Sequence, residues 1–562
     1  MRNTQRWNLE IIDREKHLVG KVYDYIVIGA GSSGGVIAAR LSESGKYRVL
    51  CLEAGTKGAN HIWTRSPLGG AFMIHDPKVN WNDFSEPGES HGGRPIHVPH
   101  GKILGGSSAI NATIANRGQS GDYDHWAQLG CRGWAFHDVL PFFKALEATS
   151  IGVEELRGRD GPVAITYSSK LSPFYDLFIA SAEAAGIPYN PDYLGSRQFG
   201  VAMAQLAARR GKRHSTATQY LAPARSRSNL TVVGGALATR LLIEGKECAG
   251  VRFERGGRFH EVRAAREVIV SSGTINSPKL LELSGIGNPQ VLGQLGISAA
   301  HALPGVGENL RDHFGPTLRW TLNKPGISIC DQGRGWKLAR ELLRYVIFGK
   351  GFISQGLGTM RVFARSHEGV EDSDVQMMGN PFLVQVGGGT GISGTHGKRS
   401  MSRVDGFYMS TQVQRPESTG SVHIRSAQPD VPPAIRYNFL ATETDRRVAI
   451  AGVRLAREIV AKPPLGRFVD KELAPGPGVQ SDDEILSFIR STGSTTYHPV
   501  GTCKMGHDAL AVVDDRLRVH GIARLRVADA SIMPMIVSGN TGVPCMMIGE
   551  KAADMILSDA GT

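Results

Sequence analysis

Three glycines near the start of the chain have the spacing of a phosphate-binding turn. Gly29, Gly31 and Gly34 follow the apolar run 23–28 (YDYIVI) and precede a stretch of small, helix-compatible residues. In a strand–turn–helix unit the first glycine permits the tight turn, the second lets the backbone approach a pyrophosphate, and the third allows helix and strand to pack closely. The helix N-terminus adds amide donors for the phosphates. We therefore predict a dinucleotide site whose loop includes Ser32 and Ser33.

An acidic residue follows the second apolar run, at the position where a dinucleotide site binds the ribose. Glu53 ends a second apolar run, 49–52, and lies nineteen residues after Gly34. Its carboxylate can accept hydrogen bonds from ribose hydroxyls, and an acid here disfavours the additional phosphate of NADP. FAD and NAD are the cofactors that remain. The alternative is a purely structural turn, in which the glycines serve only the backbone.

A second glycine-rich segment, 101–111 (GKILGGSSAIN), combines small residues with hydroxyls. Such a segment can wrap a large planar cofactor at close range, but many segments of this composition are ordinary loops. The sequence of this segment alone leaves both interpretations open.

A central sheet is needed to bring these turns together. Four short apolar runs are typical of buried parallel strands: 23–28, 49–52, 267–271 and 525–528. Because they lie far apart in sequence, we expect a nucleotide-binding domain built from discontinuous segments.

The region from 320 to 490 has a different pattern. Residues 421–425 and 434–438 alternate apolar and polar side chains, as half-buried antiparallel strands do, and 338–348 has amphipathic helical character. The glycine-rich segment 387–394 is either a lid or a plain surface loop.

Composition excludes several classes of protein. The 562 residues are 41% hydrophobic and 21% charged, which is typical of a globular chain with more than one structural unit. The formal charge of +12 is not gathered into one basic block, so we expect no nucleic-acid partner.

The six cysteines have neither CxxC nor zinc-finger spacing, so no metal site is expected. No secretory signal or membrane-spanning run is found, which predicts a cytoplasmic protein without a transmembrane segment. The sequence contains no pattern from which the oligomeric state can be predicted.

Three longer segments carry family motifs. They are 101–124 (GKILGGSSAINATIANRGQSGDYD), 273–287 (GTINSPKLLELSGIG) and 303–313 (LPGVGENLRDH). Together with the N-terminal unit and a His/Asn region near the C-terminus, they resemble the glucose–methanol–choline (GMC) flavoprotein oxidoreductases over nearly the whole chain. The resemblance implies FAD rather than NAD. It also implies an α/β fold (α+β overall), with a Rossmann-like FAD-binding domain and a substrate domain on an antiparallel sheet.

Domain limits follow from the same resemblance. We expect the FAD-binding domain to comprise 20–160, 205–316 and 496–562. The substrate-binding domain is expected to comprise 161–204 and 317–495.

The resemblance also selects His498 from 18 histidines as the catalytic base, and Asn540 as the second active-site position. Alcohols ionise too weakly at neutral pH, so an imidazole with a pKa near working pH suits the removal of the hydroxyl proton. The hydride would pass to the flavin N5. Asn540 would donate a hydrogen bond to the substrate oxygen. Electrons would then pass to oxygen or to a quinone-like acceptor.

Further cofactor contacts are implied by the matching positions. They are Ala54, Trp81, Lys102, Gly106, Ser107, Asn111, Leu237, Asp529, Ala530, Asn540 and Thr541. Some relatives attach their flavin covalently through a histidine near position 109 or 110. Alanine and isoleucine stand there in this chain, so we expect non-covalent FAD.

The substrate leaves little trace in the sequence. Five residues form either an apolar substrate pocket or ordinary core: Met377, Met378, Phe382, Val384 and Phe407. An aromatic, furanic or medium-chain primary alcohol is the expected substrate, to be oxidised to the aldehyde. The alternatives are a flavoprotein lyase of the hydroxynitrile-lyase type with no net redox turnover, a flavoprotein without turnover, a light-driven decarboxylase, and an NAD dehydrogenase.

Overall fold

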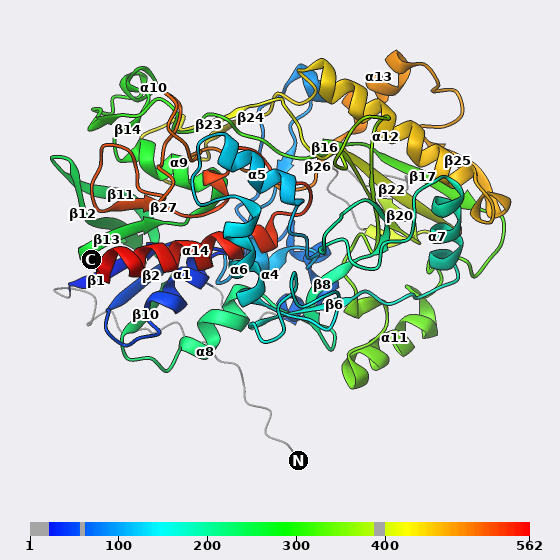
Figure 1. Cartoon of the computed structure of the whole chain (residues 1–562), viewed down its shortest axis with the longest axis horizontal. Coiled ribbons are helices and arrows are strands. Elements are labelled where there is room, and N and C mark those ends of the chain that lie inside the picture. Colours follow the sequence, from blue (N-terminus) through cyan, green and yellow to red (C-terminus); the bar gives the residue numbers. More distant parts are fainter. Residues whose placement is uncertain (1–21, 57–61, 387–398, 562) are drawn as a thin grey trace.

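A seven-stranded sheet forms the first half of the molecule (Figure 1). The computed structural model describes residues 22–56, 62–386 and 399–561. The strand order is β10 (Leu230–Gly234), β2 (Val49–Glu53), β1 (Tyr23–Ile28), β13 (Arg258–Val270), β12 (Glu247–Arg255) and β11 (Leu237–Glu244), with β27 (Leu525–Val527) beside β13. Strands β10, β2, β1, β13 and β27 are parallel, and β12 and β11 extend the sheet antiparallel. The four predicted runs thus meet in one sheet, and that prediction is confirmed.

Helices cover this sheet because its central strands are apolar on both faces. All of β2 and nearly all of β1 are buried. The helices around the sheet are α1 (Gly34–Leu41), α9 (Gly273–Leu283) and α14 (Gly542–Gly561). Helix α14 contacts α1 although they come from opposite ends of the chain, and it also contacts α6 (Phe136–Leu146) (Figure 1).

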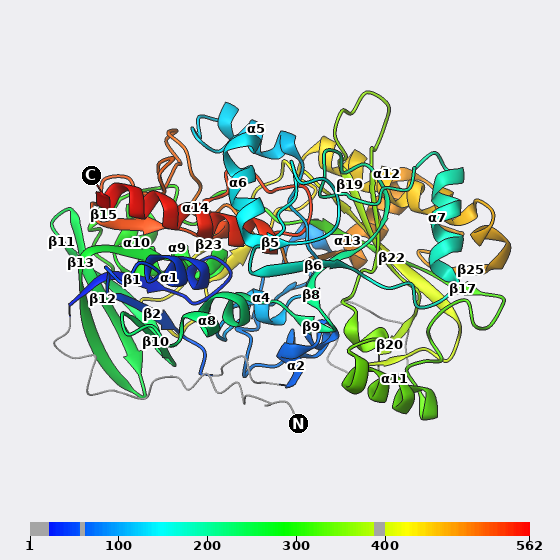
Figure 2. The same cartoon turned by 60° about the horizontal axis from the view of Figure 1, so that its bottom comes forward.

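A six-stranded antiparallel sheet forms the second half (Figure 2). Its order is β25 (Val469–Ala474), β17 (Thr317–Leu322), β22 (Gly406–Val413), β19 (Val375–Asn380), β18 (Met360–Ala364) and β7 (Gly200–Met203). Helix α12 (Glu443–Ala461) packs on β19 and β22 and contacts α7 (Phe174–Ala184) and α13 (Asp482–Thr492). Its buried side chains, such as Val453 and Ile459, recur at helical spacing, so its apolar face points to the core. A Rossmann-like sheet plus an antiparallel sheet is the predicted fold class.

Smaller elements join the two halves. The remaining strands form short sheets: β5 (Glu147–Ala148), β6 (Val163–Tyr167), β8 (Gln205–Arg209) and β9 (Lys212–Arg213); β3 (Asp83–Phe84) with β4 (His97–Val98); β14 (Ile286–Gly287) with β15 (His301–Ala302); β16 (Phe314–Gly315) with β26 (Ser494–Thr495); β20 (Val384–Val386) with β21 (Arg399–Met401); β23 (Ser421–His423) with β24 (Ala434–Arg436). The remaining α-helices are α2 (Ile62–Arg65), α3 (Gly70–Met73), α4 (Ser107–Ile110), α5 (Ser120–Gln128), α8 (Ala222–Ala224), α10 (Pro289–Gln294) and α11 (Gly335–Phe348).

Several local predictions have a definite outcome. The alternating segments near 421 and 434 are antiparallel strands, but they pair only with each other as β23 and β24. The amphipathic stretch is helix α11. The glycine-rich segment 387–394 lies outside the described residues. The domain limits stay a prediction; β6 and β8, on either side of the expected boundary at 204, pair in one sheet.

The six cysteines are all buried and free. Among the helices of the described ranges, none is both long and apolar enough to cross a bilayer. Within the same ranges no group of three or more His, Cys, Asp or Glu residues could hold a metal ion.

Candidate active site

The turn after β1 is built from close backbone contacts that only glycine allows. Gly29 has a φ of +99°, and a Cβ there would lie 2.3 Å from the Ser271 carbonyl oxygen. A Cβ on Gly34 would lie 2.0 Å from the Gly29 carbonyl oxygen. These two glycines therefore bring α1 against the ends of β1 and β13, as the spacing predicted.

The two glycine-rich segments face each other. A Cβ on Gly106 would lie 2.7 Å from the Gly31 Cα, whereas a Cβ on Gly31 would meet nothing closer than the Gly106 Cα at 3.9 Å. Gly31 is therefore not required by packing within the protein, so its missing side chain leaves bare backbone beside the cavity. Such a surface suits a pyrophosphate, which needs close approach to main-chain donors.

Glu53 lies at the carboxyl end of β2, buried beside this turn. One carboxylate oxygen accepts the Ala30 N–H at 3.0 Å and the other accepts the Gly55 N–H at 2.8 Å. Burial raises the pKa of Glu53 to about 7, against the effect of these two donors. Each oxygen keeps a second lone pair that a ribose hydroxyl can use.

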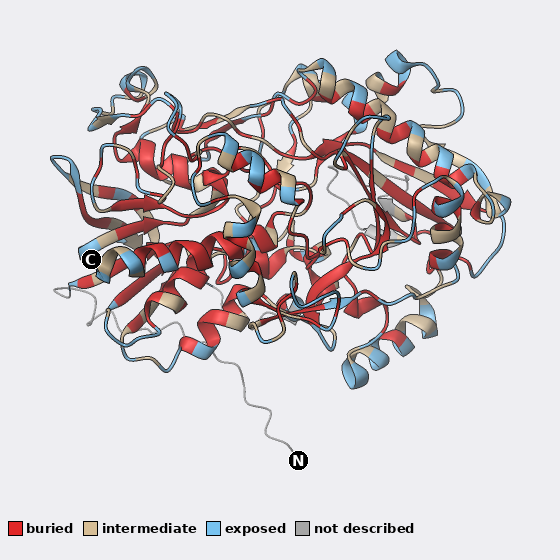
Figure 3. Cartoon of the chain, viewed as in Figure 1, coloured by how far each residue is buried: buried red, intermediate tan, exposed pale blue. Residues whose placement is uncertain are grey.

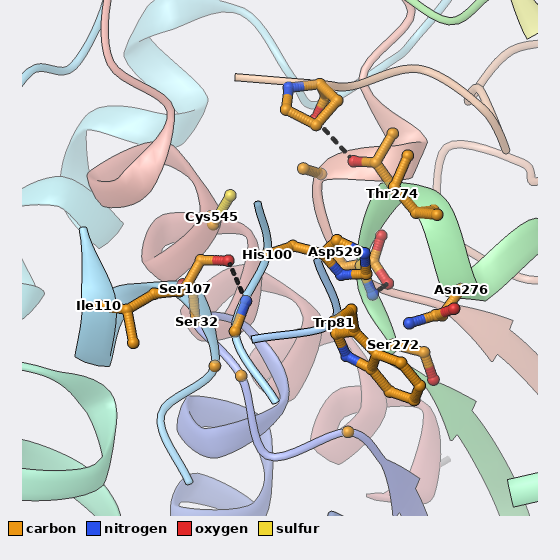
Figure 4. A pocket seen from close by; sticks show the side chains of 18 of the residues that line it. Ser32, Trp81, His100, Ser107, Ile110, Ser272, Thr274, Asn276, Asp529 and Cys545 are labelled. Carbon is orange, nitrogen blue, oxygen red and sulfur yellow. Dashed lines mark hydrogen bonds between the residues drawn. The ribbon is translucent and has the colours of Figure 1, made fainter. Parts of the chain in front are cut away.

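One elongated cavity runs from Glu53 to His498. Figure 4 shows Ser32, Ser107 and Cys545 on one side of it, with Trp81, Ser272 and Asn276 on the other. The predicted cofactor residues that line it are Gly29, Gly31, Ser32, Ser33, Glu53, Ala54, Trp81, Gly106, Ser107, Asn111, Leu237, Asp529, Ala530, Asn540 and Thr541. Two are not among its lining residues: Gly34, which packs against Gly29, and Lys102, whose Nζ lies 4.4 Å from the Trp81 ring centre. The individual FAD contacts stay a prediction.

Asp529 connects β27 to the start of α9. Its Oδ2 accepts the Gly273 N–H at 2.9 Å and the Ser277 hydroxyl at 2.6 Å, while Oδ1 accepts the Ser531 N–H at 2.8 Å. This side chain therefore holds three segments together at the cavity wall.

His498 lines the cavity, and a hydrogen bond from its backbone N–H fixes its position. Its N–H donates to Asp312 Oδ1 at 2.9 Å, and Oδ2 of the same carboxylate accepts the hydroxyls of Tyr437 and Thr495. Tyr497, just before it, has a φ of +66°, an uncommon conformation for a bulky residue. The clamp by Asp312 stabilises this strained turn.

Only one assignment of donors and acceptors is consistent with the hydrogen bonds around Asn540. Arg361 Nη2 donates to the Asn540 side chain, and because arginine can only donate, the atom that faces it is Oδ1. The amide nitrogen Nδ2 then lies 2.9 Å from His498 Nε2. An amide nitrogen can only donate, so Nε2 of His498 must be the unprotonated nitrogen.

The other side of His498 agrees with this assignment. Its Nδ1 lies 3.0 Å from His313 Nδ1 and 3.0 Å from the Thr496 hydroxyl. His313 Nε2 lies 2.9 Å from the Gln414 carbonyl oxygen, so this nitrogen carries the proton and His313 Nδ1 accepts. His498 therefore carries its proton on Nδ1 and presents the Nε2 lone pair.

Electrostatics keep both histidines neutral. Burial lowers the pKa of His498 well below its usual value, and the nearby His313 and Arg361 lower it further. Burial lowers the pKa of His313 to about 4. Burial also lowers the pKa of Arg361 to about 10, so its guanidinium remains charged at neutral pH. A neutral imidazole with an available lone pair can act as a general base.

Two neighbours of the base were not singled out from the sequence. His313 ends the motif 303–313 that was quoted without a role for its residues, and Arg361 interrupts the apolar strand β18. A lone arginine in a fully buried strand was the available signal. Arg361 makes no ion pair with a described carboxylate, and its Nε and Nη1 have no hydrogen-bond acceptor there.

The five residues expected in an apolar pocket or in the core do not line the cavity. Met377 and Phe407 are core residues of the second half of the molecule, and Phe382 belongs to a smaller core cluster against which Val384 packs. None of the five therefore contributes to this cavity, and the pleat of β19 and β22 turns Met377 and Phe407 toward the core.

A dinucleotide cavity lined by a buried, neutral histidine fits a flavin-dependent oxidoreductase that acts on alcohols. Family models described as GMC oxidoreductase match residues 23–315 and 416–549. The chain belongs to the GMC oxidoreductase family, and FAD is its cofactor. The glycine turn and the bare backbone at Gly31 fit FAD, and no histidine at 109 or 110 is present to tether it.

Known proteins give further comparisons. The oxygen-dependent choline dehydrogenase of Brucella anthropi is 38% identical over 536 residues, which is 95% of each chain. That of Vibrio vulnificus is 37% identical over 541 residues, 95% of this chain and 94% of the relative. The crystal structure of pyridoxine 4-oxidase from Mesorbium loti has a TM-score of 0.83 at 26% identity, covering 95% of this chain and 99% of that one. Formate oxidase has a TM-score of 0.87 at 25% identity, covering 96% and 99%.

Proposed function

We propose that this protein oxidises a compact, choline-sized primary alcohol to the aldehyde, with His498 as the base. The observation that carries the proposal is the Nε2 lone pair of His498, whose availability is set by Asn540 and Arg361 on one side and His313 on the other. The substrate hydroxyl would donate to Nε2, which takes its proton as the carbinol hydride leaves. FAD, when bound, supplies the acceptor for that hydride.

Asn540 has a second task when substrate binds. In the free protein its Nδ2 donates to His498 Nε2 at 2.9 Å. A substrate hydroxyl competes for the same lone pair, which frees an Nδ2 hydrogen to donate to the substrate oxygen. That bond strengthens as negative charge develops on the oxygen, so Asn540 both orients the substrate and stabilises the transition state.

The size class of the substrate is inferred from the curated relatives, whose name is choline dehydrogenase. Their name favours a small alcohol over the aromatic or furanic one expected from the sequence.

The charges around the cavity bear on whether the substrate must be a cation. Buried Arg361 lies behind Asn540, and the two carboxylates that line the described cavity, Glu53 and Asp529, are both bonded to backbone N–H groups. A cationic substrate gains little here, so we propose that the positive charge of choline is not required.

Anaerobic titration of the holoenzyme tests both parts of the proposal. The visible flavin absorbance is followed as choline, its neutral carbon isostere, benzyl alcohol and hydroxymethylfurfural are added in turn. We expect bleaching with the two choline-sized alcohols, with the neutral isostere at least as effective as choline. Stronger bleaching by benzyl alcohol would overturn the size class. A yellow protein that none of these reduces would overturn the redox assignment.

The electron acceptor is tested in the same cuvette. The relatives' name, oxygen-dependent, favours oxygen, so admitting air should restore the flavin band. If the band returns only when a soluble quinone is added, the acceptor is quinone-like. No observation here favours the lyase alternative.

A further inference from the structure

Helix α11 (Gly335–Phe348) carries its apolar side chains on the side that faces solvent. Val346 is 77% exposed and Trp336 68% exposed, and Leu342, Leu343 and Ile347 are exposed with them. Spacings of three, four and seven residues place these side chains on one face of the helix. A helix of a globular protein normally turns this face to the core, as α12 does.

The opposite face of α11 attaches the helix to the protein. Leu338 and Tyr345 pack against a core cluster that includes Phe352, and the Tyr345 hydroxyl donates to the Gly211 carbonyl oxygen at 3.2 Å. Glu341 on the same side is buried, and its carboxylate accepts the Phe352 N–H at 3.3 Å. The helix is therefore firmly placed, and its exposed apolar face is not a consequence of fraying. It lies at the edge of the molecule (Figures 1 and 2), with much of its surface exposed (Figure 3).

Basic residues flank the apolar face. Between residues 334 and 350 the chain has five basic side chains and one acidic one, Glu341. Arg340 and Arg344 lie within 3.6 Å of the buried Glu341 carboxylate, and Lys337 pairs with Asp331. The Arg340 guanidinium also lies over the Trp336 ring at 5.4 Å. Apolar and basic groups thus occupy adjoining strips of one exposed surface.

We propose that α11 docks this protein on an anionic phospholipid surface, lying in the plane of the interface. An exposed apolar strip of Trp, Leu, Ile and Val, bordered by Lys and Arg, has the chemistry that inserts among lipid headgroups and attracts their negative charge. The helix has 14 residues and lies along the protein surface, so it binds the membrane without crossing it.

Charge decides between a membrane and a second copy of the chain. In an antiparallel two-fold contact the same patch meets itself, so the strip of Arg340 and Arg344 would approach its equivalent on the second copy. The like charges of the two strips oppose that contact. An anionic lipid surface matches both strips at once.

A short segment connects α11 to the wall of the cavity. The segment after α11, the short turn Phe352–Ser354, is tied to the cavity wall because the Ser66 hydroxyl donates to the Ile353 carbonyl oxygen at 2.7 Å. The neighbouring Pro67 and Leu357 line the cavity. Docking is measurable whatever alcohol the protein oxidises.

Vesicle flotation of the holoenzyme tests the proposal. Vesicles of phosphatidylcholine alone are compared with vesicles that also contain phosphatidylglycerol, at low and high salt. We expect flotation with phosphatidylglycerol vesicles, weakened by salt and by omission of the anionic lipid. The double variant Val346→Ser/Ile347→Ser should bind roughly tenfold less, because two apolar side chains no longer insert. Leu343→Ser serves as a second, milder variant.

The matched control is Val153→Ser, which changes an exposed valine outside α11 and should float like the wild type. Flavin content and alcohol-dependent bleaching should be the same in all variants. Absence of flotation, or equal flotation of wild type and double variant, would overturn the proposal. A dimer by light scattering that the double variant dissociates, without flotation, would assign the face to a second copy and would overturn it as well.

Discussion

Nδ1 of His498 and Nδ1 of His313 lie 3.0 Å apart, and only one of these two nitrogens can carry a proton in the neutral pair. His313 already donates from Nε2 to the Gln414 carbonyl oxygen, so the shared proton belongs to His498. The rings meet nearly edge to face, at 85°. The tautomer of His498 is thus set from both sides, by His313 at Nδ1 and by Asn540 at Nε2.

Replacing the proposed base, His498, should slow flavin reduction and leave the cofactor bound. His498→Ala should retain FAD but reduce the rate of anaerobic flavin reduction by at least ~10²-fold, as expected when a general base is lost. Stopped-flow absorbance measures this rate. His137→Ala, which changes an exposed histidine, is the control and should reduce at the wild-type rate. Near-normal reduction in His498→Ala would show that another group takes the proton.

His313 should act as a positioning residue. His313→Leu removes one of the two acceptors near the His498 Nδ1 proton and leaves only the Thr496 hydroxyl, so we expect flavin reduction to slow by roughly tenfold. His313→Asn can still accept through Oδ1 and should recover most of the rate. A leucine variant and an asparagine variant with equal defects would contradict this role and point to packing instead.

The charge of Arg361 should control the pH dependence of flavin reduction. The reaction needs neutral His498, whose pKa is lowered by burial, by His313 and by Arg361. In the wild type the rate should therefore be constant near neutral pH and fall only in acid, well below pH 6.5. Arg361→Met removes a nearby cation, which raises that pKa and moves the fall in rate to higher pH.

Arg361→Lys is the charge-matched control for this experiment. It keeps the cation, so the midpoint should stay close to that of the wild type even if the rate drops because Asn540 is held less firmly. The prediction fails if the methionine variant retains the wild-type pH profile.

The bare backbone at Gly31 should matter only to the cofactor. A Cβ there would meet no protein atom closer than 3.9 Å, so Gly31→Val should fold yet bind FAD poorly because its side chain occupies the space of the pyrophosphate. The flavin-to-protein absorbance ratio after purification, with circular dichroism as the test of folding, measures both effects. Gly478→Val, also at an open position, should keep full flavin. Full flavin in Gly31→Val would contradict the phosphate site.

Acid precipitation of the holoenzyme shows whether FAD is bound covalently or non-covalently. With alanine and isoleucine at positions 109 and 110, we expect all of the flavin in the supernatant. A yellow pellet would mean that another side chain forms a covalent bond to it.

The dinucleotide unit could be predicted from sequence because its determinants are local. Tyr23–Ile28, the glycine turn and α1 are consecutive, and Gly29 and Gly34 are each required by a close contact within the unit or with the adjoining strand β13. His498 and Asn540 were found by resemblance, since a histidine in a loop has no pattern of its own. The substrate side could not be predicted in this way, because the apolar residues around 377–407 face the core rather than the cavity.

By itself, the sequence determined the strands, the phosphate turn and the amphipathic character of α11. Only the tertiary structure decided which face of α11 is outside, because the amphipathic pattern is the same whichever face packs. It also decided the partners of the base. His313, Arg361, His498 and Asn540 come from four distant segments, and the lone pair on His498 depends on hydrogen bonds that exist only when those segments are packed together.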